Sequence, residues 1–444
     1  MSAGGAVATL WEALALPPAD VTALRITGTE PVLPSVFALG TLAGACVGAT
    51  LLAASGVAGL PAAVEVSMRE AAAAFRSERF IRLDGEAIGD PWAPLSGDYR
   101  AADGWVRLHC NFDHHRDAAC AALGVPADRA AVERAVAERG ALDVEEAVIA
   151  AGGAAGAMRA RDEWRSGSQC AALAGLPVVL LRSTGASPAV PIPAGTVARP
   201  LAGVRVLDLT RVIAGPVCGR ALAGLGAEVT HVGSSKLPTI PLLDLDTGRG
   251  KRQLDLDLRT EDGRAALRSL VTEADVLVQS YRPGALARLG LGPGDLAAIR
   301  PGIVAVDVSA YGPGGPWAKR RGFDSLVQMV SGIAREGGRA AGLDGPKPLP
   351  AQALDHATGW LAALAAITGL RRRASEGGSW HAEVSLARTA AWLDSLGRVP
   401  LDPSTADDSV ADLLAETDTP AGRLTHVRMP GRIAGEPLGW RRTG

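Results

Sequence analysis

Short apolar runs alternate with longer helical stretches between residues 200 and 310. The runs with the length and composition of buried strands are Val204–Leu209, Gly226–Val232, Lys251–Leu258, Asp275–Val278 and Ile303–Val308. Helices are predicted from the turn at Ala214–Pro216 through Leu225, over Thr260–Ala274 and over Gly294–Ile299. Strands that alternate with helices are typical of a parallel sheet, in which ligands bind beyond the carboxyl ends of the strands. The pattern therefore predicts an α/β fold with a doubly wound, Rossmann-like parallel sheet, and no GxGxxG dinucleotide motif follows its first strand.

Residues 85–185 follow a different pattern, which predicts a smaller α+β domain. Gly97–His109 has the pattern of a hairpin around an Asp103–Gly104 turn, and helices are expected from about Asp117 to Ala151 and from Ala154 to Ala174. The stretch Ser187–Pro200 is rich in Pro, Ala and Ser, which favours a linker. We therefore divide the chain into an Ala/Gly-rich helical segment (1–80), the small domain (81–190), a linker (191–200), the Rossmann-like domain (201–395) and a C-terminal tail (396–444).

The segment Pro31–Val64 contains no charged residue and is long enough to cross a bilayer. It is interrupted by prolines and is rich in glycine and alanine, which drive membrane insertion weakly. We therefore expect a buried, tightly packed helix in this segment and no membrane span.

The chain contains a weak internal repeat, which supports this interpretation. The paired stretches are Leu33–Gly44 with Leu349–Gly359, where one residue is inserted, and Val64–Met68 with Ala382–Leu386. Each copy predicts a turn, an Ala-rich helix and a short strand. Asp355 of the second copy corresponds to Gly40 of the first, so only one copy keeps a carboxylate.

Asp355 is the leading candidate for chemistry. The 15 residues that follow it, His356 to Leu370, contain no Asp, Glu, Lys or Arg. A carboxylate in such apolar surroundings is costly unless it is paired, hydrogen-bonded or used. The structural alternative is a helix N-cap, in which the carboxylate accepts a free backbone N–H at the start of the helix.

Composition narrows the class of protein. The 444 residues are 48% hydrophobic and carry a net charge of −2, which gives no electrostatic argument for binding nucleic acid or an anionic membrane. The first 20 residues contain no Lys or Arg ahead of an apolar core, so no signal peptide is expected. The five cysteines, which form no CxxC motif, favour a cytoplasmic location; they are Cys46, Cys110, Cys120, Cys170 and Cys218.

A series of short motifs resembles the family III CoA-transferases, which include formyl-CoA and carnitine CoA-transferases and α-methylacyl-CoA racemases. In order, the motifs are Pro200–Thr210, Ala214–Pro216, Gly226–Val229, Gly250–Arg252, Ala274–Val278, Tyr281–Gly284, Tyr311–Pro313, Gly322–Asp324, Asp355 and Glu383–Leu386. Residues 90–180 are similar to the small domain of the family. In the family the small domain follows the sheet domain, whereas here it precedes it. The resemblance also implies a homodimer of interlocked chains.

The resemblance implies that Asp355 is a nucleophile. Its carboxylate would attack an acyl-CoA thioester, and an aspartyl-CoA thioester would then pass CoA to an incoming carboxylic acid. Backbone N–H groups would stabilise the tetrahedral oxyanions, and the candidates are the glycine pairs Gly337–Gly338 and Gly377–Gly378. Coenzyme A is expected as part of the substrate, and no metal is expected.

Residues expected to hold CoA follow from the same motifs. They are Ile213, Ala214, Leu256, Asp257, Leu258, Arg259, Ser280, Tyr281, Arg282, Arg288, Arg321, Gly322 and Phe323. Arg282, Arg288 and Arg321 have the geometry to neutralise phosphates. Ser234 stands where the family has an arginine, so the usual adenine or phosphate contact is not expected there.

Two further functions remain open alternatives to the transferase. Racemases of the family carry a histidine where this chain has Phe323, which cannot transfer a proton, so an acyl-CoA racemase or isomerase would need another base. His356 adjoins Asp355, but neighbouring residues on a helix diverge by about 100°. A non-catalytic acyl-CoA-binding subunit is the second alternative.

Three histidines lie close together in the small domain. His109, His114 and His115, together with Asp113, bring metal ligands into one stretch of the chain. The adjacent pair does not have the i, i+4 spacing of helical metal ligands, and no second ligand cluster accompanies it. The sequence therefore favours a site without metal.

Overall fold

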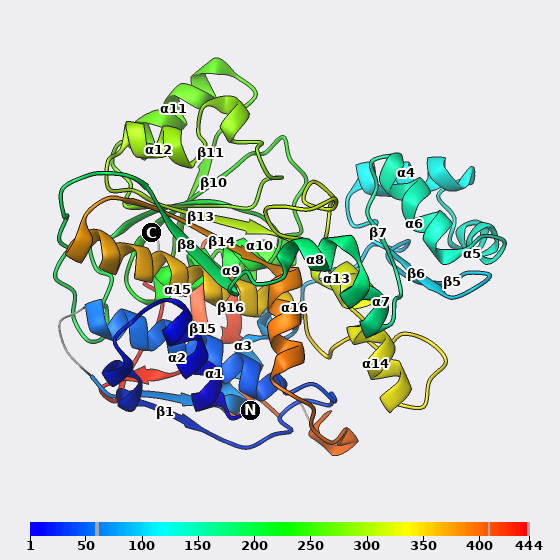
Figure 1. Cartoon of the computed structure of the whole chain (residues 1–444), viewed down its shortest axis with the longest axis horizontal. Coiled ribbons are helices and arrows are strands. Elements are labelled where there is room, and N and C mark those ends of the chain that lie inside the picture. The colour runs from blue at the N-terminus through cyan, green and yellow to red at the C-terminus, as the bar shows by residue number, and fades with distance from the viewer. Residues whose placement is uncertain (58–61, 407–408, 442–444) are drawn as a thin grey trace.

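The computed structural model describes residues 1–57, 62–406 and 409–441 (Figure 1). Its largest element is a seven-stranded sheet in the order β11-β10-β9-β12-β13-β14-β8. Six strands are parallel, and β8 pairs antiparallel with β14 at one edge. The strands are β8 (Val179–Gly185), β9 (Arg205–Leu209), β10 (Glu228–Gly233), β11 (Lys251–Asp255), β12 (Val276–Gln279), β13 (Val304–Ser309) and β14 (Ser379–Ser385). The five strands predicted between residues 200 and 310 are confirmed.

Helices cover both faces of this sheet. Val206 and Val276 belong to the core that includes α9 and α15, while Leu207 and Leu277 belong to the opposite core with α11 and α12. Because neighbouring side chains of a strand point to opposite faces, a sheet covered on both sides needs apolar residues in succession. The helices are α9 (Ala214–Gly224), α11 (Glu261–Val271), α12 (Pro293–Ile299) and α15 (Ala353–Glu376). The predicted turn at residues 214–216 is the first turn of α9.

The small domain contains a three-stranded antiparallel sheet, β5 (Gly97–Arg100), β6 (Trp105–Leu108) and β7 (Ala155–Ala157). The predicted β5–β6 hairpin is confirmed. Its helices are α4 (Asp113–Leu123), α5 (Arg129–Ala137) and α6 (Ala141–Ala150). The helical prediction over residues 154–174 is confirmed for the short helices α7 (Arg161–Ser166) and α8 (Ser168–Leu173) and is wrong at its start, where the strand β7 lies. A Cβ on Gly156 would lie 3.1 Å from the Leu326 carbonyl oxygen, so β7 needs small residues, and their sequence resembles an Ala-rich helix.

The N-terminal segment repeats the connection β13–α15–β14–α16 in a shorter form. It consists of β1 (Leu24–Thr27), α2 (Leu39–Val57), β2 (Val64–Ser67) and α3 (Met68–Ala74), preceded by α1 (Ala3–Ala13). Strands β1 and β2 are parallel, as are β13 and β14, and α16 (Leu386–Ser395) follows β14 as α3 follows β2. The internal repeat is therefore confirmed as a structural repeat.

Helix α2 is a core element of the described structure. By length and composition alone it could cross a membrane, but 89% of its apolar window is buried inside the molecule. It packs along α15, and the Thr50 hydroxyl donates a 3.0 Å hydrogen bond to the Trp360 carbonyl oxygen. The prediction of a buried, tightly packed helix is confirmed.

The C-terminal segment returns to the N-terminal half. A hairpin of β15 (Leu414–Thr419) and β16 (Gly422–Val427) pairs with β3 (Arg82–Leu83) and β4 (Glu86–Ala87), and β17 (Arg432–Ile433) with β18 (Glu436–Pro437) extends the β1–β2 sheet. The remaining helices are α10 (Pro241–Thr247), α13 (Asp324–Val330) and α14 (Ile333–Ala340), with a 3-10 turn, η2, at Ser77–Phe80. Figure 1 shows the small domain projecting to one side of this assembly.

Candidate active site

Asp355 lies in the first turn of α15, where the helix dipole favours negative charge. The N-cap residue is Gln352, so the interpretation of Asp355 as an N-cap is wrong. Its side chain is 7% exposed and borders a cavity of about 260 Å³. Among the described residues, no donor forms a hydrogen bond to its carboxylate. A buried carboxylate with one free face toward a cavity is able to react with a ligand there.

The cavity walls come from distant parts of the chain. The N-terminal half supplies Glu78, Arg79, Ile81, Arg82, Ala87, Ile88, Gly89, Pro91, Trp92, His109 and Asn111. The sheet domain supplies Val212, Ile213, Ile240, Leu242, Leu243, Phe323, Gln352 and Asp355. The site therefore exists only when the two halves of the chain pack together.

Asp324 supports Asp355 from behind. It is fully buried, and its carboxylate accepts a 2.9 Å hydrogen bond from the backbone N–H of Asp355 and another from the Gln328 amide. These donors favour the ionised form of Asp324, although burial raises its pKa. Burial raises the pKa of Asp355 well above its ordinary value, and the charges of Asp324 and Glu78 raise it further. Asp355 is therefore the carboxyl group of this pair that holds a proton most strongly.

His356 does not act as a base in the cavity. Its Nε2 lies 3.0 Å from Glu78 Oε2, and its ring stacks against Phe75 at a centroid distance of 5.6 Å. The ring is fully buried and is not part of the cavity wall. The expectation that it points away from the reacting carboxylate is confirmed, and its contact is with Glu78, a wall residue that the sequence did not indicate.

Phe323 borders the cavity beside Asp355, as its motif predicted. Its ring lies flat against the imidazole of His109, with centroids 3.5 Å apart and an interplanar angle of 3°. From the sequence, His109 was a candidate only for binding a metal. The structure instead makes it a wall residue of the cavity, which only the packing of the small domain on α13 could reveal.

The loop after β9 supplies another wall of the cavity. Val212 has a positive φ of 75°, which is unfavourable for a β-branched residue. Such backbone strain concentrates at functional sites. Ile213 follows in the cavity wall, and Ala214 is the buried first residue of α9. Both were predicted as CoA contacts.

The other predicted CoA residues lie outside the cavity. Leu256–Arg259 and Ser280–Arg282 follow β11 and β12, so they share the carboxyl edge of the sheet with the loop after β9. Arg259 is exposed and already pairs with Asp257 at 2.7 Å, and this hydrogen bonding lowers the pKa of Asp257 to about 2. Arg288 is exposed, and Gly322 is tightly packed, because a Cβ there would lie 2.4 Å from Ala310 Cβ.

Positive charge gathers near this edge. Burial and the neighbouring charge of Arg282 lower the pKa of Arg321, whose guanidinium also donates to the Gly152 carbonyl oxygen. Arg211 lies with its guanidinium 5.9 Å from the Phe112 ring centroid. Ser234, which follows β10, receives a 3.3 Å hydrogen bond from the Lys236 backbone N–H. Of the three predicted arginines, Arg282 thus acts electrostatically on Arg321, and Arg288 lies in the turn at Ala287–Leu289, with its guanidinium beside Gly284.

The predicted oxyanion-hole glycines are wrong. Gly377 and Gly378 lie at the opposite end of α15, about 33 Å from Asp355 at 1.5 Å per residue. Gly337 and Gly338 lie in α14, where added Cβ atoms would lie 2.3 Å from the Lys347 oxygen and 2.0 Å from the Gly345 oxygen. Both pairs permit close backbone packing and neither borders the cavity.

The three histidines of the small domain do gather in space, with the rings of His114 and His115 4.1 Å apart and those of His109 and His115 6.1 Å apart. Asp113 pairs with Arg116 at 2.8 Å. Within residues 1–57, 62–406 and 409–441, no group of three or more His, Cys, Asp or Glu side chains is arranged to hold a metal ion.

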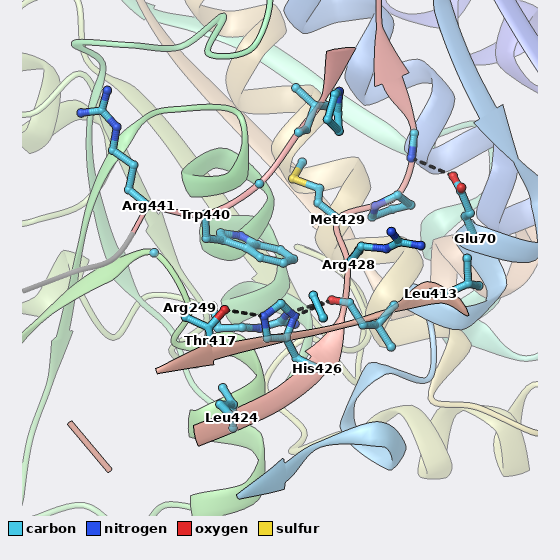
Figure 2. A pocket seen from close by; sticks show the side chains of 18 of the residues that line it. Glu70, Arg249, Leu413, Thr417, Leu424, His426, Arg428, Met429, Trp440 and Arg441 are labelled. Carbon is cyan, nitrogen blue, oxygen red and sulfur yellow. Dashed lines mark hydrogen bonds between the residues drawn. The ribbon is translucent and has the colours of Figure 1, made fainter. Parts of the chain in front are cut away.

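A second cavity, of about 310 Å³, lies beneath the C-terminal hairpin (Figure 2). Its buried polar side chains are paired with one another. Arg249 donates to Asp246 at 2.8 Å, lies 2.7 Å from His426 Nδ1 and stacks on the Trp440 ring at 4.1 Å. Although this cavity is larger, the side chains of Arg249 and His426 are already paired, whereas the Asp355 carboxylate accepts no hydrogen bond among the described residues, so the Asp355 cavity is the better candidate.

Comparison with known proteins identifies the family. The sequence profile described as CoA-transferase family III matches residues 24–190 and 201–397. The chain belongs to CoA-transferase family III. The first match covers the N-terminal copy of the repeat and the small domain, and the second covers the strands β9 to β14 with the second copy of the repeat.

Relatives of this family member carry related names. An acyl-CoA transferase of Gibberella moniliformis is 35% identical over 67% of this chain and 56% of its own length. The acetyl-coenzyme A transferase nodX of Hypoxylon pulicicidum is 37% identical over 51% of this chain and 38% of its own length. The crystal structure of Rv3272 from Mycobacterium tuberculosis matches 45% of this chain and 59% of its own at 32% identity, with a TM-score of 0.40. The chain thus spans about half the length of the curated relatives it matches.

Proposed function

We propose that this family III member is a CoA-transferase that moves CoA from an acyl-CoA to a carboxylic acid through an aspartyl-CoA thioester on Asp355. The observation that supports this most directly is the buried Asp355 carboxylate, which faces the cavity from the first turn of α15. The relatives named as CoA-transferases support the reaction class. They include succinyl-CoA:glutarate CoA-transferases of mouse and human.

The reaction begins when an oxygen of ionised Asp355 bonds to the thioester carbon. The C–S bond then breaks, which leaves a mixed anhydride and CoA thiolate. The thiolate attacks the aspartyl carbonyl carbon and expels the first acid as a carboxylate. An incoming carboxylate reverses both steps and leaves as the new acyl-CoA, so Asp355 is regenerated.

CoA is proposed to approach along the carboxyl edge of the sheet. The strand order, with β9 between β10 and β12, supports the proposal of a doubly wound, Rossmann-like sheet. In such sheets ligands bind where the strand order reverses, beside the loop that holds Val212 and Ile213. Arg282 and Arg321 supply positive charge nearby for the phosphates. No metal participates in these steps.

The transferase is preferred to a racemase for an electrostatic reason. Phe323 cannot transfer a proton, and the imidazole beside it, His109, has its pKa lowered to about 3, chiefly by burial. A base with such a low pKa accepts a proton poorly at neutral pH. Neither Phe323 nor His109 therefore supplies the second base of a two-base proton transfer, and the wall carboxylate Glu78 already pairs with His356 at 3.0 Å.

We further propose that the protein acts in the cytoplasm as an interlocked homodimer. Light scattering would then give a mass of twice the 45.3 kDa chain. A monomer at micromolar concentration would contradict the dimer without touching the proposed chemistry.

The central test is mass spectrometry of the intact protein after incubation with acetyl-, propionyl- and succinyl-CoA. We expect a CoA adduct that maps to Asp355 and disappears when a carboxylic acid is added. An Asp355→Ala variant that still forms the adduct, or still exchanges label between acyl-CoA and acid, would refute the mechanism.

A further inference from the structure

His109 presents an imidazole to the same cavity as Asp355. It follows β6, and its backbone N–H donates a 3.0 Å hydrogen bond to the Ala154 carbonyl oxygen, which continues the pairing of the small-domain sheet. The side chain is 3% exposed and is held face to face on Phe323, with the Trp92 ring against its edge at 6.0 Å. Its position is therefore fixed by packing on two sides.

One nitrogen of this imidazole lacks a partner. Among the described residues, nothing forms a hydrogen bond with His109 Nδ1, although the atom is buried. Nδ1 has almost no surface open to the cavity, so the nitrogen left to meet a ligand is Nε2, which also forms no hydrogen bond among the described residues. Buried polar groups are nearly always paired, so an unpaired imidazole at a cavity points to a partner that arrives with a ligand. Burial, reinforced by the nearby His115 and Arg107, lowers the pKa of His109 to about 3. The ring is therefore neutral at physiological pH and keeps one N–H to donate.

His115 provides a natural comparison. It is equally buried, its Nδ1 also lacks a partner among the described residues, and burial likewise lowers its pKa to about 3. His115 does not border the cavity, whereas His109 does. The feature that distinguishes His109 is thus its access to the space in front of Asp355.

We propose that His109 is a further catalytic residue, whose imidazole hydrogen-bonds the acyl carbonyl oxygen of the thioester while Asp355 attacks the carbonyl carbon. The inference rests on the proposed transferase function. The attack forms a C–O bond and moves the carbonyl π electrons to the oxygen beside the imidazole. Collapse re-forms the C=O bond and expels CoA thiolate, and His109 neither gains nor loses a proton.

A neutral donor suits this site better than a cation. An imidazolium in the cavity would attract the Asp355 carboxylate and reduce its nucleophilicity. A neutral imidazole can stabilise the developing oxyanion without pairing with Asp355 in the resting enzyme. His109 would thus supply the oxyanion stabilisation that the sequence assigned to the glycine pairs, which do not border the cavity.

The first experiment compares His109→Phe, which keeps the aromatic stacking, with His109→Gln, which restores a donor near the Nε2 position. For the acyl-CoA of the panel that exchanges label fastest, we expect His109→Phe to lower kcat about 10²–10³-fold. KM should change less than about threefold, and His109→Gln should recover at least tenfold of the loss. His115→Phe is the matched control and should keep kcat within about twofold.

The second experiment needs no turnover. In Asp355→Asn protein, the carbonyl stretch of bound [1-¹³C]acetyl-CoA should lie at lower frequency than in the Asp355→Asn, His109→Phe double variant. An unchanged kcat in folded His109→Phe, or a carbonyl band that the double variant does not shift, overturns the inference while label exchange leaves the transferase intact. If wild-type protein exchanges no label, the proposed function fails, and equal carbonyl bands would overturn the His109 contact as well.

Discussion

The two copies of the repeat start their long helices in a similar way, yet only one faces a cavity. In the first copy, Glu30 Oε1 accepts a 2.6 Å hydrogen bond from the Thr41 backbone N–H at the start of α2. In the second, Asp324 Oδ2 accepts a 2.9 Å hydrogen bond from the Asp355 backbone N–H at the start of α15. A carboxylate that accepts a backbone N–H at the start of the helix is thus common to both copies; it is half-buried in the first and fully buried in the second.

The difference lies in the space around the next residue. A Cβ on Gly40 would lie 2.5 Å from Val32 Cγ2 and 3.2 Å from Glu30 Oε2, so no side chain fits there. The Asp355 side chain instead reaches a cavity of about 260 Å³. A reactive carboxylate needs a helix start, a supporting acid and an open space, and only the second copy has all three.

The largest expected effect comes from removing the nucleophile. Asp355→Ala should reduce label exchange between acyl-CoA and free acid by at least about 10⁴-fold, because the covalent route is lost. CoA binding, measured by calorimetry, should survive. Full exchange in this variant would show that another residue carries the chemistry and that Asp355 does not distinguish the two copies in function.

Separating the halves should be nearly as damaging. Residues 1–190 carry Glu78 and His109, and residues 200–444 carry Asp355, so neither half has a complete cavity. Each half alone should be poorly soluble, because α2 and β8 lose the surfaces of α15 and β14. Co-expressed halves should associate and recover exchange. A stable N-terminal half that never binds the other would show an independent domain.

Gly40→Asp tests whether the first copy can be restored. We expect no second site, because the new side chain would collide with Val32 and meet the like charge of Glu30. Thermal unfolding should show a loss of about 1–3 kcal/mol. Adduct titration should remain at about one CoA per chain, as in the wild type. Two CoA per chain would mean that lack of space around residue 40 is not the reason why the first copy has no site.

Asp324→Asn should shift the pH dependence of adduct formation. Asp355 must be ionised to attack, and the charge of Asp324 is one cause of its raised pKa. The amide oxygen can still accept the Asp355 N–H, but the opposing charge is gone, so the pKa of Asp355 should fall. The acid limb of the pH–rate profile should move to lower pH by about one unit. An unmoved limb would show that the charge of Asp324 does not control the pKa of Asp355, which leaves burial and Glu78 as its causes.

The smallest effect is on stability. A group whose pKa is raised on folding contributes stability below its unfolded pKa, and that contribution is lost as pH rises toward the folded pKa. Because the pKa of Asp355 is raised in the folded state, this group lowers the stability of the wild-type protein at pH 7, where the unfolded chain ionises it freely. Asp355→Asn should therefore raise Tm at pH 7 by a few degrees, and the difference should shrink near pH 4. A Tm gain that is equal at both pH values would point to packing instead.

The sequence by itself determined the local elements and singled out Asp355 as the candidate nucleophile. Runs of four to eight residues separated by helices sufficed to predict β9 to β13. The signal is clearest for β9, β12 and β13, since strands covered on both faces are nearly continuous in apolar residues. The charge-free α2, the repeat and Asp355 were also predictable, because each rests on neighbouring residues or on an ordered series of motifs.

Tertiary structure alone decided the rest of the site. Glu78 meets His356 across 278 positions, and His109 reaches Phe323 across more than two hundred, so no local pattern marks either contact. Strand β7 was not predicted because its small residues are required by close contact with the backbone of α13, which the local sequence does not show. Strand β8 was not predicted because its pairing partner, β14, lies far along the chain. The periodicity of apolar residues reports the local structure of one segment. A cavity forms only where separate segments pack together, so the surroundings of Asp355 could be known only from the tertiary structure.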